Sequence, residues 1–145
     1  MRGIFYKLEV IALDLEGTLI SNAFSQIARP GLYAFLEGCK SITERVVIYT
    51  TVKEDLFRRI AQLLVSEGSA PAWFATIEYI KWSCPTKDLN QIQGASVAAC
   101  VLVDDCNLYV HEGQSGQWLE VKQFASPYPE EDNELQAIFN ALKQR

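Results

Sequence analysis

The chain has 145 residues, of which 49% are hydrophobic and 21% are charged, and its formal net charge is −5. This length suits one domain with one hydrophobic core, and the composition excludes an intrinsically disordered chain. Because non-specific binding to nucleic acid depends on clustered Lys and Arg, the acidic balance argues against a nucleic-acid partner. No stretch is long and apolar enough to cross a membrane, so we expect a single soluble domain over residues 1–145 with no membrane partner.

The N-terminal segment and the cysteines bear on the compartment. Asp14 and Glu16 come too early for the apolar segment and cleavage site of a secretory signal, so we expect a cytoplasmic protein. None of the four cysteines has the paired spacing that holds zinc, and we expect reduced thiols, with Cys39 and Cys100 buried in apolar runs. The only histidine, His111, lies in a Gly-rich stretch typical of a surface turn, which leaves no base for a catalytic thiol.

Several short aliphatic runs predict the strands of a sheet. Residues 8–14, 45–50 and 99–104 are β-branched or aliphatic segments that end in a polar residue, a pattern typical of buried parallel strands. Weaker patterns indicate a further strand within residues 73–82 and an edge strand within residues 117–124.

Three other segments have the apolar spacing of amphipathic helices. These are residues 29–40, with Pro30 at the first helical position, residues 51–68, with a capping box from Thr51 to Glu54, and residues 130–143. The side chains expected to face the core are Leu32, Phe35, Leu36 and Cys39 in the first segment, Leu56, Ile60, Leu63 and Leu64 in the second, and Leu135, Ile138, Phe139 and Leu142 in the third.

The alternation of strands and helices predicts an α/β fold. A parallel, Rossmann-like sheet with helices on both faces gives three layers, connected by right-handed crossovers. Ligands of such sheets bind beyond the carboxyl ends of the strands. The residues that end each strand are therefore the first candidates for chemistry.

Polar residues follow the three principal strands. The first strand leads into Asp14-Leu15-Glu16-Gly17-Thr18, the second ends in Thr50, and the third ends in Asp104 and Asp105, with Lys87 in the preceding connection. Each residue alone is typical of a helix cap or of a solvated side chain. Together, in this order, they indicate a functional site rather than caps and solvated side chains.

This combination resembles the haloacid-dehalogenase-like (HAD) superfamily. Its four motifs are a nucleophilic Asp in an Asp-x-Asp-x-Thr sequence, a Ser or Thr at a strand end, a Lys, and a final acidic pair, and all four positions are filled here. Glu16 stands where the first motif has its second Asp. The carboxylic acid is retained, and the sequence looks like the Asp-x-Glu-Gly-Thr of the enolase-phosphatases, another branch of the superfamily.

Within the superfamily, the chain resembles the NLI-interacting-factor-like phosphatases, small protein-serine phosphatases that act on the RNA polymerase II tail. The segments that carry this likeness are Arg29–Leu32, Phe35–Leu36, Ile48–Thr50, Lys87–Leu89, Val103–Asp105 and Asp132–Leu135, within a match over residues 10–142. Only residues 19–28 separate Thr18 from Arg29, so we expect no sizeable cap domain and an open site.

The resemblance implies a phosphomonoester phosphatase that works through an aspartyl phosphate. Asp14 is then the nucleophile, and Glu16 protonates the leaving oxygen and later deprotonates the attacking water. Lys87 neutralises charge on the transferred group and, with Thr50, holds the phosphoryl oxygens. The turn that contains Gly17 and Thr18 completes the phosphate-binding set.

A Mg²⁺ cofactor is expected at the same edge. Carboxylates crowded around a phosphate repel one another unless a hard, oxygen-seeking cation screens them. The family pattern implies that Mg²⁺ contacts the Asp14 carboxylate, the Glu16 backbone carbonyl and one of Asp104 and Asp105. We favour Asp105 as this ligand, with Asp104 free to orient Lys87.

The substrate and some alternatives stay open at this level. A site without a cap suits a phosphoprotein, whose own surface excludes water, but small phosphorylated metabolites fit the same residues. A catalytically weak protein-interaction module is the main alternative, suggested by Glu16 and by Trp73, Trp82 and Trp118 as candidate exposed aromatics. Dehalogenation or phosphonate cleavage is disfavoured by the acid at Glu16, whereas a phosphotransferase is compatible with these residues.

Overall fold

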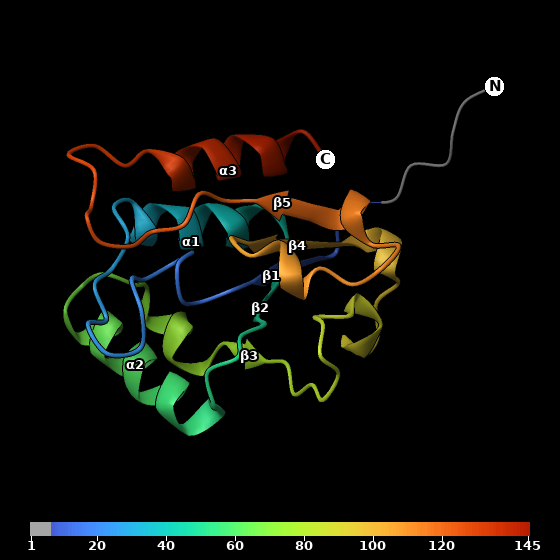
Figure 1. Cartoon of the computed structure of the whole chain (residues 1–145), viewed down its shortest axis with the longest axis horizontal. Coiled ribbons are helices and arrows are strands. Elements are labelled where there is room, and N and C mark those ends of the chain that lie inside the picture. The colour runs from blue at the N-terminus through green and yellow to red at the C-terminus, as the bar shows by residue number, and fades with distance from the viewer. Residues whose placement is uncertain (1–6) are drawn as a thin grey trace.

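The structure is a computed structural model that describes residues 7–145. Five parallel strands form one sheet in the order β3-β2-β1-β4-β5, which Figure 1 shows from bottom to top. The strands are β1 (Val10–Leu13), β2 (Arg45–Ile48), β3 (Glu78–Tyr79), β4 (Cys100–Asp104) and β5 (Trp118–Glu120), and the α-helices are α1 (Leu32–Ile42), α2 (Glu54–Ser66) and α3 (Glu134–Lys143). The predicted parallel α/β architecture is confirmed.

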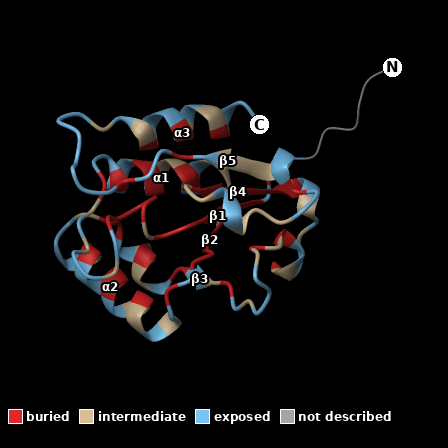
Figure 2. Cartoon of the chain, viewed as in Figure 1, coloured by how far each residue is buried: buried red, intermediate tan, exposed pale blue. Residues whose placement is uncertain are grey.

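The two faces of the sheet carry different covers. Ile11 and Leu13 of β1 face the core layer formed by α1, α2 and α3, whereas Val10 and Ala12 face the opposite layer. That opposite layer is the segment 80–99, whose helical turns are short 3₁₀ helices. Both faces are therefore buried, as Figure 2 shows by the red strands at the centre. The three α-helices all lie on one face, so of the helices predicted on both faces the opposite face carries only the short 3₁₀ helices.

Helix α1 begins later than Pro30. Gly31 occupies the N-cap with φ of +82°, so Leu32 is the first helical residue and the expected place of Pro30 at that position is wrong. Gly31 permits this start because it adopts a positive φ without a Cβ clash. The predicted inward face of α1 is confirmed.

Helix α2 also differs from its prediction at the start and in its buried face. Lys53 is the N-cap and makes no side-chain cap bond, so the capping box from Thr51 to Glu54 is wrong. The core contacts come from Phe57, Ile60, Ala61 and Leu64, whereas Leu63 is exposed. The reason is aromatic packing, because the Phe57 ring contacts the rings of Phe74 and Tyr79 and turns the helix toward them.

The weaker strand predictions are only partly confirmed. Within residues 73–82 only Glu78–Tyr79 pairs with the sheet, because residues 72–76 wind into a 3₁₀ helix after Pro71. The edge strand predicted within 117–124 shortens to Trp118–Glu120. Cys39 and Cys100 are buried thiols as predicted. Among the described residues, no helix is long and apolar enough to cross a membrane.

The connection between β1 and α1 is a compact loop rather than a cap domain. Within it, Ile20 pairs with Ala28 in an isolated bridge, and the side chain of Phe24 projects fully into solvent. The expected absence of a sizeable cap is thus confirmed.

Candidate functional site

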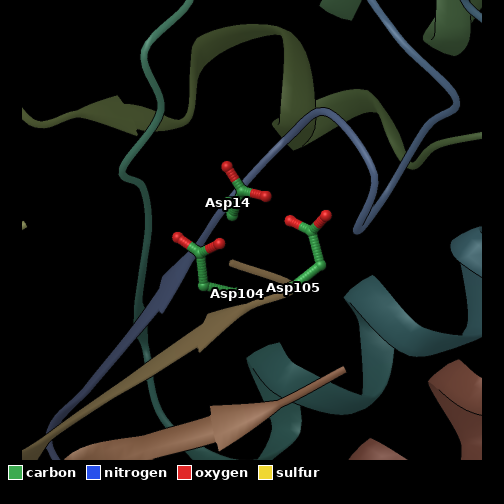
Figure 3. Close-up of side chains that lie close together, drawn as sticks. All are labelled: Asp14, Asp104 and Asp105. Atoms are coloured by element: carbon green, nitrogen blue, oxygen red, sulfur yellow. The ribbon is translucent and has the colours of Figure 1, made fainter. Parts of the chain in front are cut away.

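Strand register brings three aspartates to one edge of the sheet. Leu13 of β1 pairs with Val103 of β4, so Asp14, which follows β1, lies beside Asp104, the last residue of β4, and Asp105 follows. One oxygen from each of the three carboxylates lies within 4.8 Å of the others. Figure 3 shows the three side chains close together at the carboxyl ends of β1 and β4. The three aspartates that the sequence predicts at this edge of the sheet thus lie close together.

Lys87 enters the site from the layer opposite the long helices. Its backbone N–H donates to the carbonyl oxygen of Tyr109 at 2.7 Å, which anchors the segment 80–99 beside the loop after β4. Its buried Nζ donates to Asp14 Oδ1 at 2.9 Å and to Asp104 Oδ2. The Nζ also lies 5.0 Å from the centre of the Tyr109 ring, a cation–π distance. Lys87 thus joins the ends of β1 and β4.

The charges of this cluster perturb one another. Burial raises the pKa of Asp14 to about 7, against the opposing influence of the Lys87 ammonium group. Burial, reinforced by the charge of Asp14, raises the pKa of Asp104 above its ordinary value, and burial likewise raises the pKa of Asp105. Burial acts to lower the pKa of Lys87, but Asp14 and Asp104 hold it above its ordinary value. Asp14 and Asp104 therefore share one buried ammonium group, and Asp105 lies beside them without a contact to Lys87.

The turn after β1 fixes the second oxygen of Asp14. Thr18 Oγ1 donates to Asp14 Oδ2 at 2.8 Å and lies 3.4 Å from Asp105 Oδ1. Gly17 makes this turn possible because its φ is +76°, a conformation that residues with a Cβ rarely adopt. A Cβ at Gly17 would also lie only 2.5 Å from Asp105 Oδ2. The turn and the Asp105 carboxylate are therefore packed against each other.

We expect the substitution Gly17→Ala to weaken cation binding more than it weakens the fold. Strain at positive φ costs about 1 kcal/mol for alanine, and the new methyl group also displaces the Asp105 carboxylate. The measurement is the rise in melting temperature on addition of Mg²⁺. The matched control is Gly68→Ala, because Gly68 has the same φ of +76° but open space around its Cβ position.

If Mg²⁺ raised the melting temperatures of the Gly17→Ala and Gly68→Ala proteins equally, the packing of the turn against Asp105 would not matter for cation binding, contrary to this prediction. The expected pattern is a similar loss of stability in the two metal-free proteins, with a reduced Mg²⁺-induced shift only in Gly17→Ala.

Thr50 lies at the carboxyl end of β2, two strands away from Asp104. Its side chain is buried, and its Oγ1 accepts a hydrogen bond from the Val52 N–H at 3.1 Å. The backbone carbonyl of Thr50 accepts from the indole N–H of Trp82 at 2.8 Å, and the Trp118 indole donates to the carbonyl of Asp104 at 2.9 Å. Two tryptophans thus brace the strand ends, a role that no pattern in the sequence indicated.

The tryptophans therefore do not form the exposed aromatic surface that the sequence suggested. Trp73, Trp82 and Trp118 are all half-buried. Trp82 packs edge-on against Tyr49, with ring centres 5.4 Å apart, and against Tyr109 at 6.3 Å. Tryptophan has a large apolar body with one N–H donor, which suits a position between a core and a backbone carbonyl.

Glu16 is the predicted site residue whose carboxylate lies apart from the others. Its Oε2 accepts the backbone N–H of Ala23 at 2.7 Å. This bond ties the side chain to the loop between β1 and α1, and among the described contacts Glu16 makes none with Asp14 or Lys87. Its carboxylate is therefore not one of those that make up the aspartate cluster.

A buried ion pair supports the turn from behind. Arg29 Nε lies 3.1 Å from both oxygens of Asp132, and its Nη1 donates to the carbonyl oxygens of Gly17 at 3.4 Å and Thr18 at 3.3 Å. The guanidinium also lies over the Phe124 ring, 5.3 Å from its centre. Arg29 and Asp132 belong to the segments that carry the family resemblance, but the sequence offered no sign that they meet across 103 residues.

The donor set of the aspartate cluster fits a hard divalent cation. Mg²⁺ favours carboxylate oxygens in a compact arrangement, and a cation placed there would offset the repulsion among the three acids. The two oxygens of Asp104 are already engaged by Lys87 and by the Cys106 N–H. The Asp105 carboxylate has a long contact with Thr18, whose Oγ1 lies 3.4 Å from Asp105 Oδ1. Asp105 therefore retains more capacity than Asp104 to bind a cation.

Comparison with known proteins agrees with this geometry. The model of the family described as NLI interacting factor-like phosphatase matches residues 9–145, whereas no curated protein sequence matches the chain significantly. The match contains every residue of the cluster, from Asp14 at the end of β1 to Asp105 after β4. Since it covers nearly the whole chain, the protein belongs to the NLI interacting factor-like phosphatase family.

Proposed function

We propose that this protein is a Mg²⁺-dependent phosphomonoester phosphatase that forms an aspartyl phosphate on Asp14. The observation that carries the proposal is the placement of Asp14, whose two oxygens are held by Lys87 and Thr18 opposite Asp105. A carboxylate fixed in this way is oriented for attack at one point beyond the sheet. Family membership supports phosphatase chemistry, and the cluster supports the cation.

In the first step, an oxygen of Asp14 attacks phosphorus and the bond from phosphorus to the leaving oxygen breaks. Glu16 donates its proton to that leaving oxygen, after its carboxyl group has exchanged the Ala23 N–H for the substrate. Lys87, already 2.9 Å from Asp14, balances the negative charge on the phosphoryl group. Thr50 and the turn of Gly17 and Thr18 orient the phosphoryl oxygens.

In the second step, water attacks the phosphorus of the aspartyl phosphate. Glu16, now ionised, takes a proton from that water, and the electrons of the phosphorus–oxygen bond return to Asp14. Inorganic phosphate leaves, and both carboxyl groups regain their starting protonation states. The Glu16 carboxyl group thus serves as the acid in the first step and as the base in the second. The two-step transfer of the phosphoryl group requires both roles.

The cation site of this proposal consists of Asp14, Asp105 and the backbone carbonyl of Glu16. Mg²⁺ bound there supplies positive charge that offsets the repulsion between the carboxylates and the phosphoryl oxygens. Asp104 has a different role, because its bond to Lys87 and its acceptance of the Cys106 N–H orient the ammonium group. Asp104 is thus a positioning residue.

The test is hydrolysis of p-nitrophenyl phosphate with Mg²⁺, with excess chelator, and after Mg²⁺ is restored. Charge stabilisation by a bound cation is worth several kcal/mol, so the chelator is expected to lower turnover at least about 100-fold. Chelator saturated with Mg²⁺ is the control. If the chelator left turnover unchanged, the metal-dependent mechanism would be overturned.

The absence of a sizeable cap favours a phosphoprotein as the substrate class. A small phosphate ester leaves the strand ends exposed to water, whereas a protein surface resting on the loop of residues 19–28 covers them. The alternative, a catalytically weak interaction module, finds one supporting observation in the fully exposed Phe24 at this loop. Absence of metal-dependent turnover, together with tight binding of a phosphoprotein, would favour that alternative.

A further inference from the structure

A pocket of about 480 Å³ opens beside the proposed phosphate-binding residue Thr50. It lies at the carboxyl ends of β2 and β3 and continues onto the start of α2, where Lys53 and Glu54 line it. Trp82, which belongs to the segment 80–99, also lines the pocket. The pocket therefore adjoins the reacting centre on the side away from Asp105 and is not part of the aspartate cluster.

The walls of the pocket are attached to the phosphate-binding segment itself. Tyr79 donates its hydroxyl hydrogen to the carbonyl oxygen of Val52 at 2.5 Å, and the Trp82 indole donates to the carbonyl of Thr50 at 2.8 Å. Burial raises the pKa of Tyr79, so its hydroxyl stays a donor at neutral pH. The two aromatic side chains that line the pocket are thus held at fixed positions relative to the segment 50–52.

The charged side chains of the pocket are predominantly cationic. Lys53 and Lys81 both line it, and among residues 7–145 Lys53 forms no ion pair. The single acid, Glu54, is partly neutralised because its Oε2 lies 3.4 Å from Arg58 and its Oε1 lies 3.8 Å from the highly exposed Lys81. On a chain of net charge −5, two lysines beside the phosphate-binding edge form a local attraction for anions.

We propose that this pocket binds a second anionic group of the substrate, a carboxylate or a phosphate carried close to the scissile phosphoryl group. Lys53 and Lys81 supply the charge, and Tyr79 and Trp82 supply a rigid apolar wall that lowers the local dielectric. This inference rests on the proposed phosphatase function and names its substrate class. Substrates with one anionic group would be hydrolysed less efficiently than those with two.

The test compares kcat/KM within pairs of substrates that differ only in the second anion. One pair consists of phosphoserine peptides in which the residue next to the phosphoserine is Glu or Gln. The other pair is 1,3-propanediol bisphosphate and propyl phosphate, so the two arms separate a peptide carboxylate from a second phosphate. We expect the wild-type protein to prefer the doubly anionic member of at least one pair by about tenfold.

Three variants assign any preference to the pocket. The double variant Lys53→Gln/Lys81→Gln should reduce the preference to within about twofold, because it removes both cations. Glu54→Gln should increase the preference about two- to threefold, because it removes the acid that competes for Lys81. The control Lys122→Gln removes an exposed lysine remote from this pocket and should keep the wild-type preference.

The outcomes separate this inference from the function on which it rests. If hydrolysis depends on Asp14 but the paired substrates react equally, or if the lysine double variant keeps the full preference, the inference is overturned and the phosphatase function stands. If no substrate is hydrolysed by the wild-type protein, the proposed function itself fails. A preference that falls in the double variant and rises in Glu54→Gln supports the second-anion site.

Discussion

The substitution Asp14→Asn is expected to lower Mg²⁺-dependent hydrolysis of p-nitrophenyl phosphate by roughly 10⁴-fold or more, because it removes the nucleophile through which both steps pass. Asparagine has nearly the same shape, so its side-chain oxygen can still accept from Lys87. The fold should survive, because burial raises the pKa of Asp14 to about 7 and ionising this carboxyl group in the metal-free protein is costly. The neutral amide avoids that cost.

Two measurements make the Asp14→Asn result specific. The melting temperature of the metal-free variant should equal or exceed that of the wild-type protein, whereas its rise on addition of Mg²⁺ should be small, because one cation ligand is lost. The control is Asp55→Asn, an exposed aspartate in the first turn of α2, which should keep wild-type turnover. A folded Asp14→Asn protein that retains more than about one tenth of wild-type turnover would refute the covalent mechanism.

The substitution Asp132→Asn is expected to lower the free energy of unfolding by about 3 kcal/mol, because it leaves the Arg29 guanidinium buried without its counter-charge. The side chains of Arg29 and Asp132 are only 2% and 4% exposed. Asparagine still offers an oxygen to the Glu134 N–H, so the start of α3 keeps its contact. Equilibrium unfolding in urea measures the loss.

An exposed pair of the same chemistry provides the control for Asp132→Asn. Arg45 and Glu78 also form a two-bond guanidinium–carboxylate pair, but their side chains are 31% and 44% exposed. Because solvent screens exposed charges, Glu78→Gln should cost less than about 1 kcal/mol. Equal losses in the two variants would show that burial does not decide the contribution of these ion pairs.

The parts of the site that the sequence could predict are those that depend on neighbouring residues in the chain. Asp14, Asp104 and Asp105 could be placed together because each ends or follows a strand, and parallel strands end at one edge. Lys87 could be assigned only through the family resemblance. Its path into the site depends on the Tyr109 carbonyl and on a segment without regular structure, which no periodicity reveals.

The misplaced details share a physical cause. The buried face of α2 was shifted because contacts of Phe57 with Phe74 and Tyr79, distant along the chain, outweighed the local aliphatic pattern. The strand predicted within residues 73–82 was mostly lost for a similar reason, since local β-propensity is weaker than tertiary packing. The exposed role suggested for Trp82 failed because its indole N–H meets the Thr50 carbonyl.

Local patterns in the sequence were enough to predict the parallel α/β architecture, the principal strands and the strand-end residues, because hydrophobic periodicity and strand-end chemistry are local properties. Tertiary structure alone decided the pairing of Arg29 with Asp132, the bond between Glu16 and the Ala23 N–H, and the pocket beside Thr50. The pairing of Arg29 and the pocket join residues from separate segments, and the bond of Glu16 depends on the path of an irregular loop. Their free energy comes from burial and geometry that exist only once the chain has folded.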